Sequence, residues 1–291
     1  MAYIRIKKIK GNNYYYLVRS IRIKNKVKKI EKYLGRKKPT SEQLQKFNVS
    51  ISRYLTEQQI EKVEKLKHEF DKKYKSLSSI AKEKFIKGFL IKFTYNTNRI
   101  EGSTLSLRET SLILVDRIMP KGKTSKEVKE AENHAEAFNY MLKEKADLNL
   151  EFILKLHSIL LKNIDENAGH IREEDVGIYG VMFKPPHYEE LDYELKAFFE
   201  WYKEARILHP FELACLVHLK FVTIHPFTDG NGRISRLLMN FILKKYGYPM
   251  LDIPYEDRED YYNALETCQL EVDEKPFIGY CFNEYLMQSE T

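Results

Sequence analysis

The hydrophobic periodicity of the chain changes near residue 40, and this change constrains the fold more than any other feature. Apolar and polar side chains alternate over residues 2–34, which predicts β-strands. Turn-forming residues at 11–13 and 24–26 divide this stretch, so we expect a three-stranded antiparallel meander closed by Gly35. After residue 40 the apolar residues recur at helical spacing. We therefore expect a mainly α protein with a small N-terminal antiparallel β-sheet.

Ten helices are expected in the remainder of the chain. The first opens at Thr56, because Thr56 and Gln59 have the spacing of a capping box. The others are expected near 79–98, 106–119, 124–145, 150–163, 189–206, 209–224, 233–246, 258–270 and 276–289. Residues 169–187 are the exception, since β-branched residues, three glycines and a Pro-Pro pair predict a short β-hairpin inserted in a helical bundle.

The charge of the chain divides at the same place as its periodicity. Residues 1–40 carry 14 Lys and Arg against the single Glu31, whereas the rest carries 35 basic and 41 acidic residues. We therefore predict a basic antiparallel β meander at 1–38, a helical region at 39–105 and a helical domain at 106–291. The basic sheet could hold nucleic acid or an acidic partner, or its lysines could protect exposed edge strands, and the sequence leaves these alternatives open.

Composition argues against a membrane protein and favours a cytoplasmic one. No apolar stretch is long enough to span a bilayer, and the first residues lack the continuous apolar run of a signal peptide. The three cysteines, Cys215, Cys268 and Cys281, are widely spaced in apolar surroundings, which is typical of reduced core residues. We therefore expect a cytoplasmic protein with no membrane contact.

The strongest chemical signal is the run His-Pro-Phe-Thr-Asp-Gly-Asn-Gly-Arg-Ile-Ser-Arg at residues 225–236, which separates two helical segments. Gly230 and Gly232, on either side of Asn231, allow the backbone to turn with its N–H groups pointing inward. The helix that follows presents its positive N-terminal end to the same place. The run therefore predicts an anion-binding loop that suits a polyphosphate.

Charged and titratable side chains complete this loop. Arg233 and Arg236 lie three residues apart on the following helix and would place two guanidinium groups over the anion. Asp229 could hold Mg²⁺ together with phosphate oxygens. His225 titrates near neutral pH and could accept a proton from an attacking hydroxyl. These are the parts that phosphoryl or nucleotidyl transfer requires.

Three other interpretations explain the run less well. It is not a Walker A loop, because no Gly-Lys-Ser/Thr follows. It is not an EF-hand, because Arg233 and Asn240 stand where calcium ligands belong. A helix cap and turn without function would explain the glycines and Asn231, but not His225 together with two arginines.

The same run resembles the signature of the Fic family, His-Pro-Phe-x-(Asp/Glu)-Gly-Asn-Gly-Arg-x-x-Arg, at every fixed position. The resemblance covers roughly residues 80–290 and leaves out the basic sheet. It implies a Fic-fold helical bundle with a short β-hairpin flap, in which residues 106–291 form the catalytic domain. The implied activity is adenylylation: transfer of AMP from ATP to a Ser, Thr or Tyr hydroxyl of a target protein and of the enzyme itself, with release of pyrophosphate. Gly232 favours AMP transfer, because a relative that works as a kinase has Lys there.

The resemblance also assigns roles to the residues of the run. His225 would deprotonate the hydroxyl that attacks the α-phosphate of ATP. Asp229 would hold Mg²⁺ and would lie against the phosphates of the nucleotide. The remaining contacts with the nucleotide phosphates would come from Gly230, Asn231, Gly232, Arg233 and Arg236.

A flap and a later helix would bind the rest of the nucleotide. The flap would cover the nucleotide and align the target chain by strand addition. Its residues are Tyr179, Gly180, Val181 and Met182. Tyr261 would lie against the adenosine, and Gln269 would contact the nucleotide from a position where relatives often have Asn. Relatives are often homodimers, and the resemblance extends that expectation to this chain.

A second match lies upstream, at residues 97–102, where Thr-Asn-Arg-Ile-Glu-Gly fits the family's inhibitory motif, Ser/Thr-x-x-x-Glu-Gly/Asn. By resemblance, Glu101 would pair with Arg236 and occupy the arginine that should hold the γ-phosphate. The same carboxylate could instead orient a water against an AMP-modified target, which would make the protein a de-AMPylase. Two further alternatives stay open: a transferase of another nucleotide such as UTP, and a nucleic-acid-binding regulator that uses the basic sheet.

Overall fold

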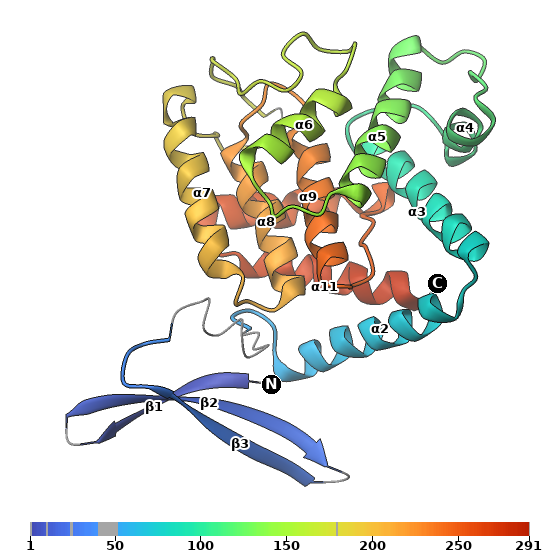
Figure 1. The fold of residues 1–291 in the computed structure, drawn as a ribbon. Coiled ribbons are helices and arrows are strands. Elements are labelled where there is room, and N and C mark those ends of the chain that lie inside the picture. Colours follow the sequence, from blue (N-terminus) through green and yellow to red (C-terminus); the bar gives the residue numbers. More distant parts are fainter. Residues whose placement is uncertain (1, 10, 24–25, 40–51, 179, 291) are drawn as a thin grey trace.

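The computed structural model describes residues 2–9, 11–23, 26–39, 52–178 and 180–290. This part of the chain consists of helices and one three-stranded sheet, and the sheet lies at one side of the helical body (Figure 1). The prediction of a mainly α protein with a small antiparallel sheet is therefore confirmed.

The N-terminal sheet is the meander that the alternating pattern predicts. Its strands are β1 (Ala2–Ile9), β2 (Asn12–Ile23) and β3 (Lys26–Gly35), which pair in the order β1-β2-β3. Both pairs are antiparallel, as short turns between consecutive strands require. Gly11 makes the first turn with a positive φ of 77°.

Every helix expected from the periodicity is present. The elements are α2 (Glu57–Ser76), α3 (Ser79–Ile100), α4 (Leu107–Ser111), the π-helical turn η1 (Leu112–Asp116), α5 (Ser125–Lys143), α6 (Leu150–Leu160), η2 (Tyr188–Glu190), α7 (Leu191–Ala205), α8 (Pro210–Ile224), α9 (Asn231–Lys245), η3 (Tyr255–Asp257), α10 (Arg258–Glu271) and α11 (Lys275–Glu290). The capping box predicted at Thr56 closes with Gln59. The helix expected at 106–119 is shorter, because η1 ends at a left-handed Arg117.

Two helices form the centre of the body. Nearly every residue of α8 and of α9 is buried, and the two pack along each other in the middle of Figure 1. A helix that is buried all round belongs to the interior of a globular fold. The short connection between α8 and α9 is therefore held between two helices buried in the core.

The prediction of a β-hairpin at 169–187 is wrong for the described residues, because they form no paired strands. None of the described residues of this segment is in a strand; the segment is an irregular loop. Pro185 and Pro186 have no N–H to donate to a ladder. The guanidinium of Arg172 occupies the carbonyls of Glu174 (2.8 Å) and Pro186 (2.6 Å), so the two ends of the loop are joined by a side chain instead of by paired strands.

The end of α3 is set by a glycine. Glu101 is the last residue before the turn, and Gly102 follows with φ 97°, a conformation that side chains rarely adopt. The N–H of Gly102 donates to the carbonyl of Arg99 (3.1 Å), and the N–H of Ser103 donates to the carbonyl of Asn98 (2.9 Å). This pattern ends the helix at Glu101 and fixes the direction in which its side chain leaves.

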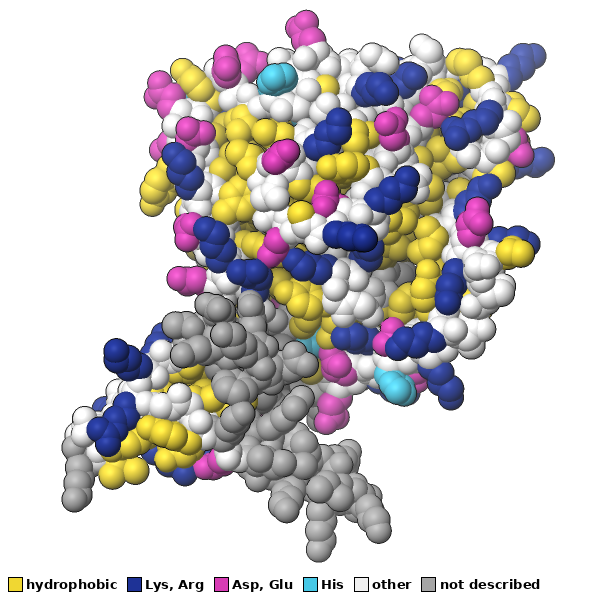
Figure 2. Space-filling model, in the orientation of Figure 1, with side chains coloured by type: hydrophobic (Ala, Val, Ile, Leu, Met, Phe, Trp, Pro, Cys, Tyr) yellow, Lys and Arg dark blue, Asp and Glu magenta, His cyan; other side chains and the backbone are white. Residues whose placement is uncertain are grey.

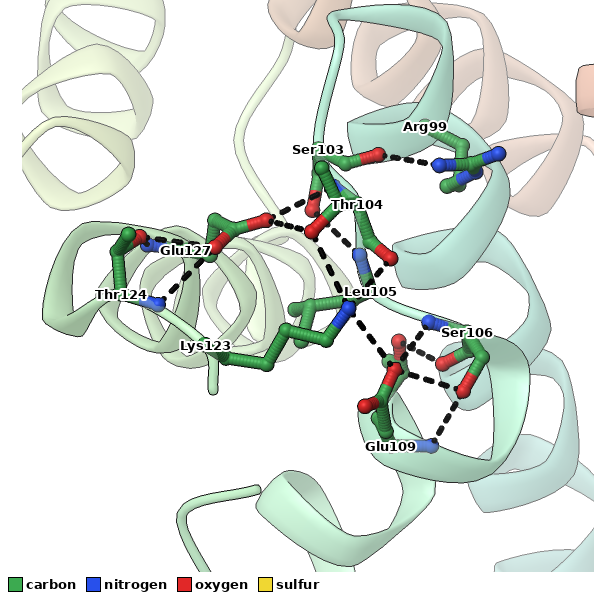
Figure 3. A network of polar contacts seen from close by, with 10 residues as sticks. Arg99, Ser103, Thr104, Leu105, Ser106, Glu109, Lys123, Thr124 and Glu127 are labelled. Carbon is green, nitrogen blue, oxygen red and sulfur yellow. Dashed lines mark hydrogen bonds and ion pairs between the residues drawn. The ribbon is translucent and has the colours of Figure 1, made fainter. Parts of the chain in front are cut away.

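The segment after this turn is tied to the start of α5 by one carboxylate (Figure 3). One oxygen of Glu127 accepts hydrogen bonds from the N–H (2.8 Å) and the hydroxyl (2.6 Å) of Thr104. The other oxygen accepts from the N–H (3.1 Å) and the hydroxyl (2.9 Å) of Thr124, the N-cap of α5. The bonds from Thr104 and Thr124 lower the pKa of Glu127 to about 2.

Two features of the described residues concern the expectations from composition. None of the described helices is both long and apolar enough to cross a membrane. Cys215, Cys268 and Cys281 are free thiols buried in the core, as predicted. Burial raises the pKa of Cys268 to about 11, so this thiol is protonated at neutral pH.

Glu127→Gln should destabilise the protein more at neutral pH than at about pH 3. An amide has a single acceptor oxygen, so it cannot accept both the bonds from Thr104 and those from Thr124, and the free energy of unfolding should fall by about 1 kcal/mol at pH 7. The Glu127 pKa is lowered from 4.5 to about 2, so its contribution is complete above pH 4.5 and is lost as the pH falls toward 2. Urea unfolding of both proteins at about pH 7 and about pH 3 measures this.

Glu151→Gln, on the exposed first turn of α6, is the matched control and should show no such pH dependence. A stability difference for Glu127→Gln that stays the same at both pH values would contradict the role of the charge.

Candidate active site

The predicted loop lies between α8 and α9 and brings its chemical residues together. His225 ends α8 with a left-handed φ of 52°, and Gly230 precedes α9 with φ 79°. The two turns reverse the chain within a few residues. His225 and Asp229 consequently lie next to the first turn of α9, where backbone N–H groups have no partner within the helix.

His225 is held in the form of a general base. Its Nδ1 lies 3.1 Å from the carbonyl of Val222, so Nδ1 carries the proton and Nε2 keeps a free lone pair. Burial lowers the pKa of His225; the bond to Val222 opposes this, and the nearby guanidinium of Arg172 adds to the lowering. The imidazole is therefore neutral at pH 7 and can accept a proton.

His157, which the sequence did not indicate, supports the loop between α8 and α9. Nε2 of His157, on α6, donates to the carbonyl of Asp229 (3.0 Å), and its Nδ1 accepts from the N–H of Gly169 (2.8 Å). Its ring stacks on Phe227 at 3.7 Å between centroids. Burial lowers the pKa of His157 to about 4, which keeps the ring neutral, as one donor and one acceptor require. No sequence signal marked it, because it stands inside an ordinary helix.

Arg172 is the second residue that the sequence analysis missed. Its Nε donates to the carbonyl of His225 (2.9 Å), while its other nitrogens hold the two ends of the 169–187 loop. The backbone N–H of Arg172 donates to the carbonyl of Pro226 (3.0 Å). This buried arginine therefore joins the flap region to the catalytic loop.

The side chain of Asn231 bonds to the backbone of the loop itself. Its amide oxygen accepts from the N–H of Phe227 (3.0 Å), and its amide nitrogen donates to the carbonyl of Phe227 (2.8 Å). Both groups are satisfied and buried, so the side chain of Asn231 stabilises the loop. A phosphate contact from this residue would have to come from its main chain.

Asp229 and Arg233 form an ion pair at the mouth of the loop. Oδ2 of Asp229 lies 3.0 Å from Nη2 of Arg233, and Oδ1 accepts from the N–H of Gly230 (2.5 Å). Burial raises the pKa of Asp229, but Arg233 and Gly230 outweigh it, and the pKa is lowered. Arg233 itself is buried, and its Nη1 also lies 3.7 Å from a carboxylate oxygen of Glu130. Its guanidinium therefore contacts two carboxylates, those of Asp229 and Glu130.

Asp229 has the character of a ligand for Mg²⁺. It is ionised, and 49% of its side chain is exposed. Among the described residues no group of three His, Cys, Asp or Glu could hold a metal by itself. Such a site fits a cation that takes one carboxylate and completes its shell with substrate phosphates and water, as Mg²⁺ does.

The ion pair predicted between Glu101 and Arg236 is present. Oε1 of Glu101 lies 2.5 Å from Nη2 of Arg236. Thr97 adds its hydroxyl, which accepts from Nε (2.7 Å), and its carbonyl, which accepts from Nη2 (3.3 Å). Arg236 is only 1% exposed, so α3 supplies most of the partners that this buried cation needs.

Gly232 provides the space for this pair. A Cβ atom at this position would lie 2.5 Å from Oε1 of Glu101 and 3.3 Å from Nη1 of Arg236. Real Cβ atoms do not approach an oxygen so closely. The absence of a side chain at 232 is therefore a condition for the contact between α3 and α9.

Tyr261, which is predicted to face the adenosine, lies in the core of the protein. Tyr261 is 1% exposed, and its hydroxyl lies 3.1 Å both from Nη1 of Arg236 and from Nε2 of His218. Tyr261 lies on the face of α10 that packs into the core, where its hydroxyl contacts Arg236. The next residue, Tyr262, is 40% exposed and donates to the carbonyl of Ile100 (2.9 Å). His218 is a buried residue of α8.

Gln269 lines a cavity of about 410 Å³ beside the end of α8. Its Nε2 donates to the hydroxyl of Thr223 (3.3 Å). The cavity wall is partly aromatic and aliphatic, and includes Phe198, Trp201, Leu219, Ile224 and Val272. A second cavity, of about 490 Å³, lies against α5 and the end of α6 and contains none of the predicted site residues.

The described flap residues, Gly180, Val181 and Met182, are exposed or half-buried. Tyr179 is outside the described residues. Gly180 is exposed with φ 81°, and 81% of Met182 is exposed. The N–H of Met182 donates to a carboxylate oxygen of Glu266 on α10 (2.6 Å), which links the loop to the helix of Tyr262. The flap is therefore anchored at this point by a side chain.

Comparison with known proteins assigns the chain to a family. Residues 147–243 match the Fic/DOC family. The fold resembles that of Fic-1 (aa134–508) from C. elegans, with a TM-score of 0.70 and 31% identity over 80% of this chain and 70% of that one. A Fic domain containing signaling protein from Bacteroides thetaiotaomicron has a TM-score of 0.70 and 28% identity, over 80% and 97% of the two chains. The chain belongs to the Fic family.

Its curated relatives are named as adenylyltransferases. Protein adenylyltransferase Fic of Nematostella vectensis is 35% identical over 209 residues, which are 69% of this chain and 48% of that protein. Protein adenylyltransferase fic-1 of Caenorhabditis elegans is 36% identical over 196 residues, 65% of this chain and 38% of that one. The chain thus spans half or less of the length of these relatives.

Gly232→Ala should weaken the ion pair between Glu101 and Arg236. The added methyl group overlaps Oε1 of Glu101, the end of a flexible side chain, so the carboxylate should move away from Arg236 and its contribution of about 1 kcal/mol to the free energy of unfolding should be lost. In a Glu101→Gly background most of this loss should disappear, because the overlapping atom is gone. Urea unfolding of the four proteins gives the coupling, expected at about 1 kcal/mol. Equal losses in both backgrounds would show that the side chain of Glu101 does not require the glycine.

Proposed function

We propose that this protein is an autoinhibited adenylyltransferase that transfers AMP from ATP to a hydroxyl of a target protein and of itself. The observation that carries the proposal is a neutral His225, with a free Nε2, beside an anion-binding loop at the start of α9. The names of the relatives agree with this activity.

The reaction uses His225 as its base. Nε2 accepts the proton of the target hydroxyl as its oxygen attacks the α-phosphorus of ATP. A bond forms between that oxygen and phosphorus, and the bond from phosphorus to the β-phosphate oxygen breaks. Pyrophosphate leaves with the electron pair. The rigid α8–α9 scaffold with His157 and Arg172 contributes positioning, which is the main source of catalysis in such transfers.

Binding of ATP would use the residues around this base. The backbone N–H groups of Gly230, Asn231 and Gly232 would face the phosphates, and Asp229 would hold Mg²⁺, which neutralises phosphate charge. The cavity beside Gln269 would take the adenine, since its wall is partly apolar. Tyr262, rather than Tyr261, would be the tyrosine exposed to the nucleotide.

Inhibition follows from the partners of Arg236. A γ-phosphate needs this guanidinium, but Glu101 already holds Nη2. Thr97 and Tyr261 would keep Arg236 oriented when Glu101 leaves, because their bonds do not depend on it. Glu101 is the C-cap of α3, so its withdrawal needs a movement at the end of one helix only.

Removal of AMP from a modified protein is the second candidate. The side chain of Glu101 is 32% exposed. Among the contacts of the described residues, its Oε1 alone bonds to Arg236. The other oxygen is in a position to orient a water. Release of AMP from a modified target, lost in Glu101→Gly, would favour this reaction, and labelling with UTP in place of ATP would indicate another nucleotide.

Glu101→Gly should raise self-labelling by ATP carrying a label in its α-phosphate. A hydrogen bond to a charged group contributes about 1.5–3 kcal/mol. At about 1.4 kcal/mol for each factor of ten, loss of the competitor should raise labelling roughly 10- to 100-fold at low ATP. Autoradiography of the purified proteins measures it. No increase would contradict the inhibitory role.

Two controls separate inhibition from chemistry. Glu101→Gly combined with His225→Ala should lose the label, and label that survives would exclude His225 as the base. Glu109→Gly, which removes the Ser106 capping box on α4, also replaces a glutamate by glycine near the end of α3 but should not raise labelling.

The pH dependence of Glu101→Gly should report the lowered pKa of His225. A lowered pKa keeps the imidazole neutral as the pH falls through 6.5, so the acid limb of the labelling rate should lie below about 6.5. The carboxylate of Glu101 raises the pKa of His225, so its removal lowers that pKa further. Initial rates at low ATP between about pH 5 and pH 8, which report the enzyme before the nucleotide binds, measure this limb. A limb above 6.5 would contradict the lowered pKa of His225.

A further inference from the structure

The N-terminal sheet carries tyrosines and cations on the same face. In an antiparallel sheet, residues directly opposite each other project to the same side. The register places Lys7 opposite Tyr14 and Arg5 opposite Tyr16. Tyr16 in turn stands opposite Tyr33. These five residues define one surface, which we call the cation–tyrosine face.

The side chains of this face contact one another. The rings of Tyr16 and Tyr33 have centroids 5.3 Å apart, and those of Tyr14 and Tyr33 are 6.2 Å apart. The ammonium of Lys7 lies 4.5 Å from the ring centre of Tyr16, and the guanidinium of Arg36 lies 5.4 Å from that of Tyr14. Tyr33 is 49% exposed, so the cluster meets solvent.

The charge of the face is positive but not uniform. Glu31 accepts an ion pair from Lys7 (2.8 Å) and another from Arg5, so it neutralises part of their charge. Arg5, Lys7 and Arg36 nevertheless carry three positive charges against the one negative charge of Glu31, and residues 1–40 as a whole carry 14 basic residues against this one glutamate. Figure 2 shows basic side chains next to apolar ones on the sheet. A polyanion is therefore the ligand whose charge matches this surface.

Edge protection explains the lysines of a small sheet, but it does not explain three tyrosines among them. An acidic protein would satisfy the cations and would leave the rings unused. A nucleic acid duplex hides the faces of its bases. A single strand offers phosphates and free base faces together, and aromatic rings beside cations are how proteins bind it without sequence preference.

We propose that the cation–tyrosine face binds single-stranded nucleic acid, with bases stacked on Tyr33 and its neighbours and phosphates held by the surrounding cations. The binding tolerates many sequences, because every base has a face that can stack. It is independent of the nucleotide transfer at His225, and it provides a means to bring the enzyme to nucleic acid or to proteins bound there.

The test is fluorescence anisotropy of the full chain with a labelled oligothymidylate of about 20 nucleotides. Tyr33→Leu should weaken binding roughly 5- to 100-fold, whereas Tyr33→Phe, which keeps the ring, should bind as the wild type does. Lys7→Gln should reduce the slope of log affinity against log salt by about 0.7. Tyr193→Leu, an exposed tyrosine on α7, is the matched control and should have no effect.

Four outcomes would overturn the proposal. The first is no binding at about 50 mM salt. The second is equal affinity for a duplex, with Tyr33→Leu as good as the wild type, which would indicate charge alone. The third is equally strong competition by polyglutamate with no effect of Tyr33→Leu, which would indicate an acidic protein. The fourth is loss of binding in both Tyr33→Leu and Tyr33→Phe, since the ring would then not be the cause.

Self-labelling by the Glu101→Gly enzyme provides an independent measurement. Tyr33→Leu placed in that enzyme should leave the labelling rate unchanged, because Tyr33 lies in the N-terminal sheet and outside the α8–α9 site. Failure of nucleic-acid binding and failure of AMP transfer are thereby distinguished.

Discussion

The positive charge of Arg236 is the constraint on which the site depends. Its guanidinium is buried in the centre of the protein, and an unpaired buried charge is strongly destabilising. Thr97, Tyr261 and Glu101 together supply its partners. In the proposed enzyme, a phosphate would replace the carboxylate of Glu101, so inhibition and substrate binding become a competition between two anions for one cation. Gly232 makes that competition sterically possible.

The rest of the site keeps the loop in one conformation. Asn231 bonds to the backbone of Phe227, His157 bonds to the carbonyl of Asp229, and Arg172 bonds to the carbonyl of His225. None of these bonds needs a ligand, so the loop is organised before substrate arrives. Preorganised positioning is what phosphate transfer requires of a protein. Buried polar contacts within the protein therefore fix the positions of His225, of the backbone N–H groups and of Asp229.

The sheet and the helical body differ in their charge and in the kind of ligand that each could bind. The body is mildly acidic and is built around a buried cation, whereas the sheet is strongly basic and places its cations beside exposed rings. Basic charge attracts polyanions over a distance, while a buried arginine recognises one phosphate at close range. The proposals for AMP transfer and for nucleic-acid binding consequently rest on different residues and can be tested one without the other.

The sequence by itself determined the helices, the meander and the chemistry of the loop, because periodicity, caps and turn residues act over a few neighbouring positions. It also indicated the pair of Glu101 and Arg236, through a resemblance. Only the tertiary structure decided that His157 and Arg172 support the loop, that Tyr261 is buried, and that the described flap residues form no strand. These features join residues far apart in the chain, and helix packing, which local patterns do not specify, brings them into contact.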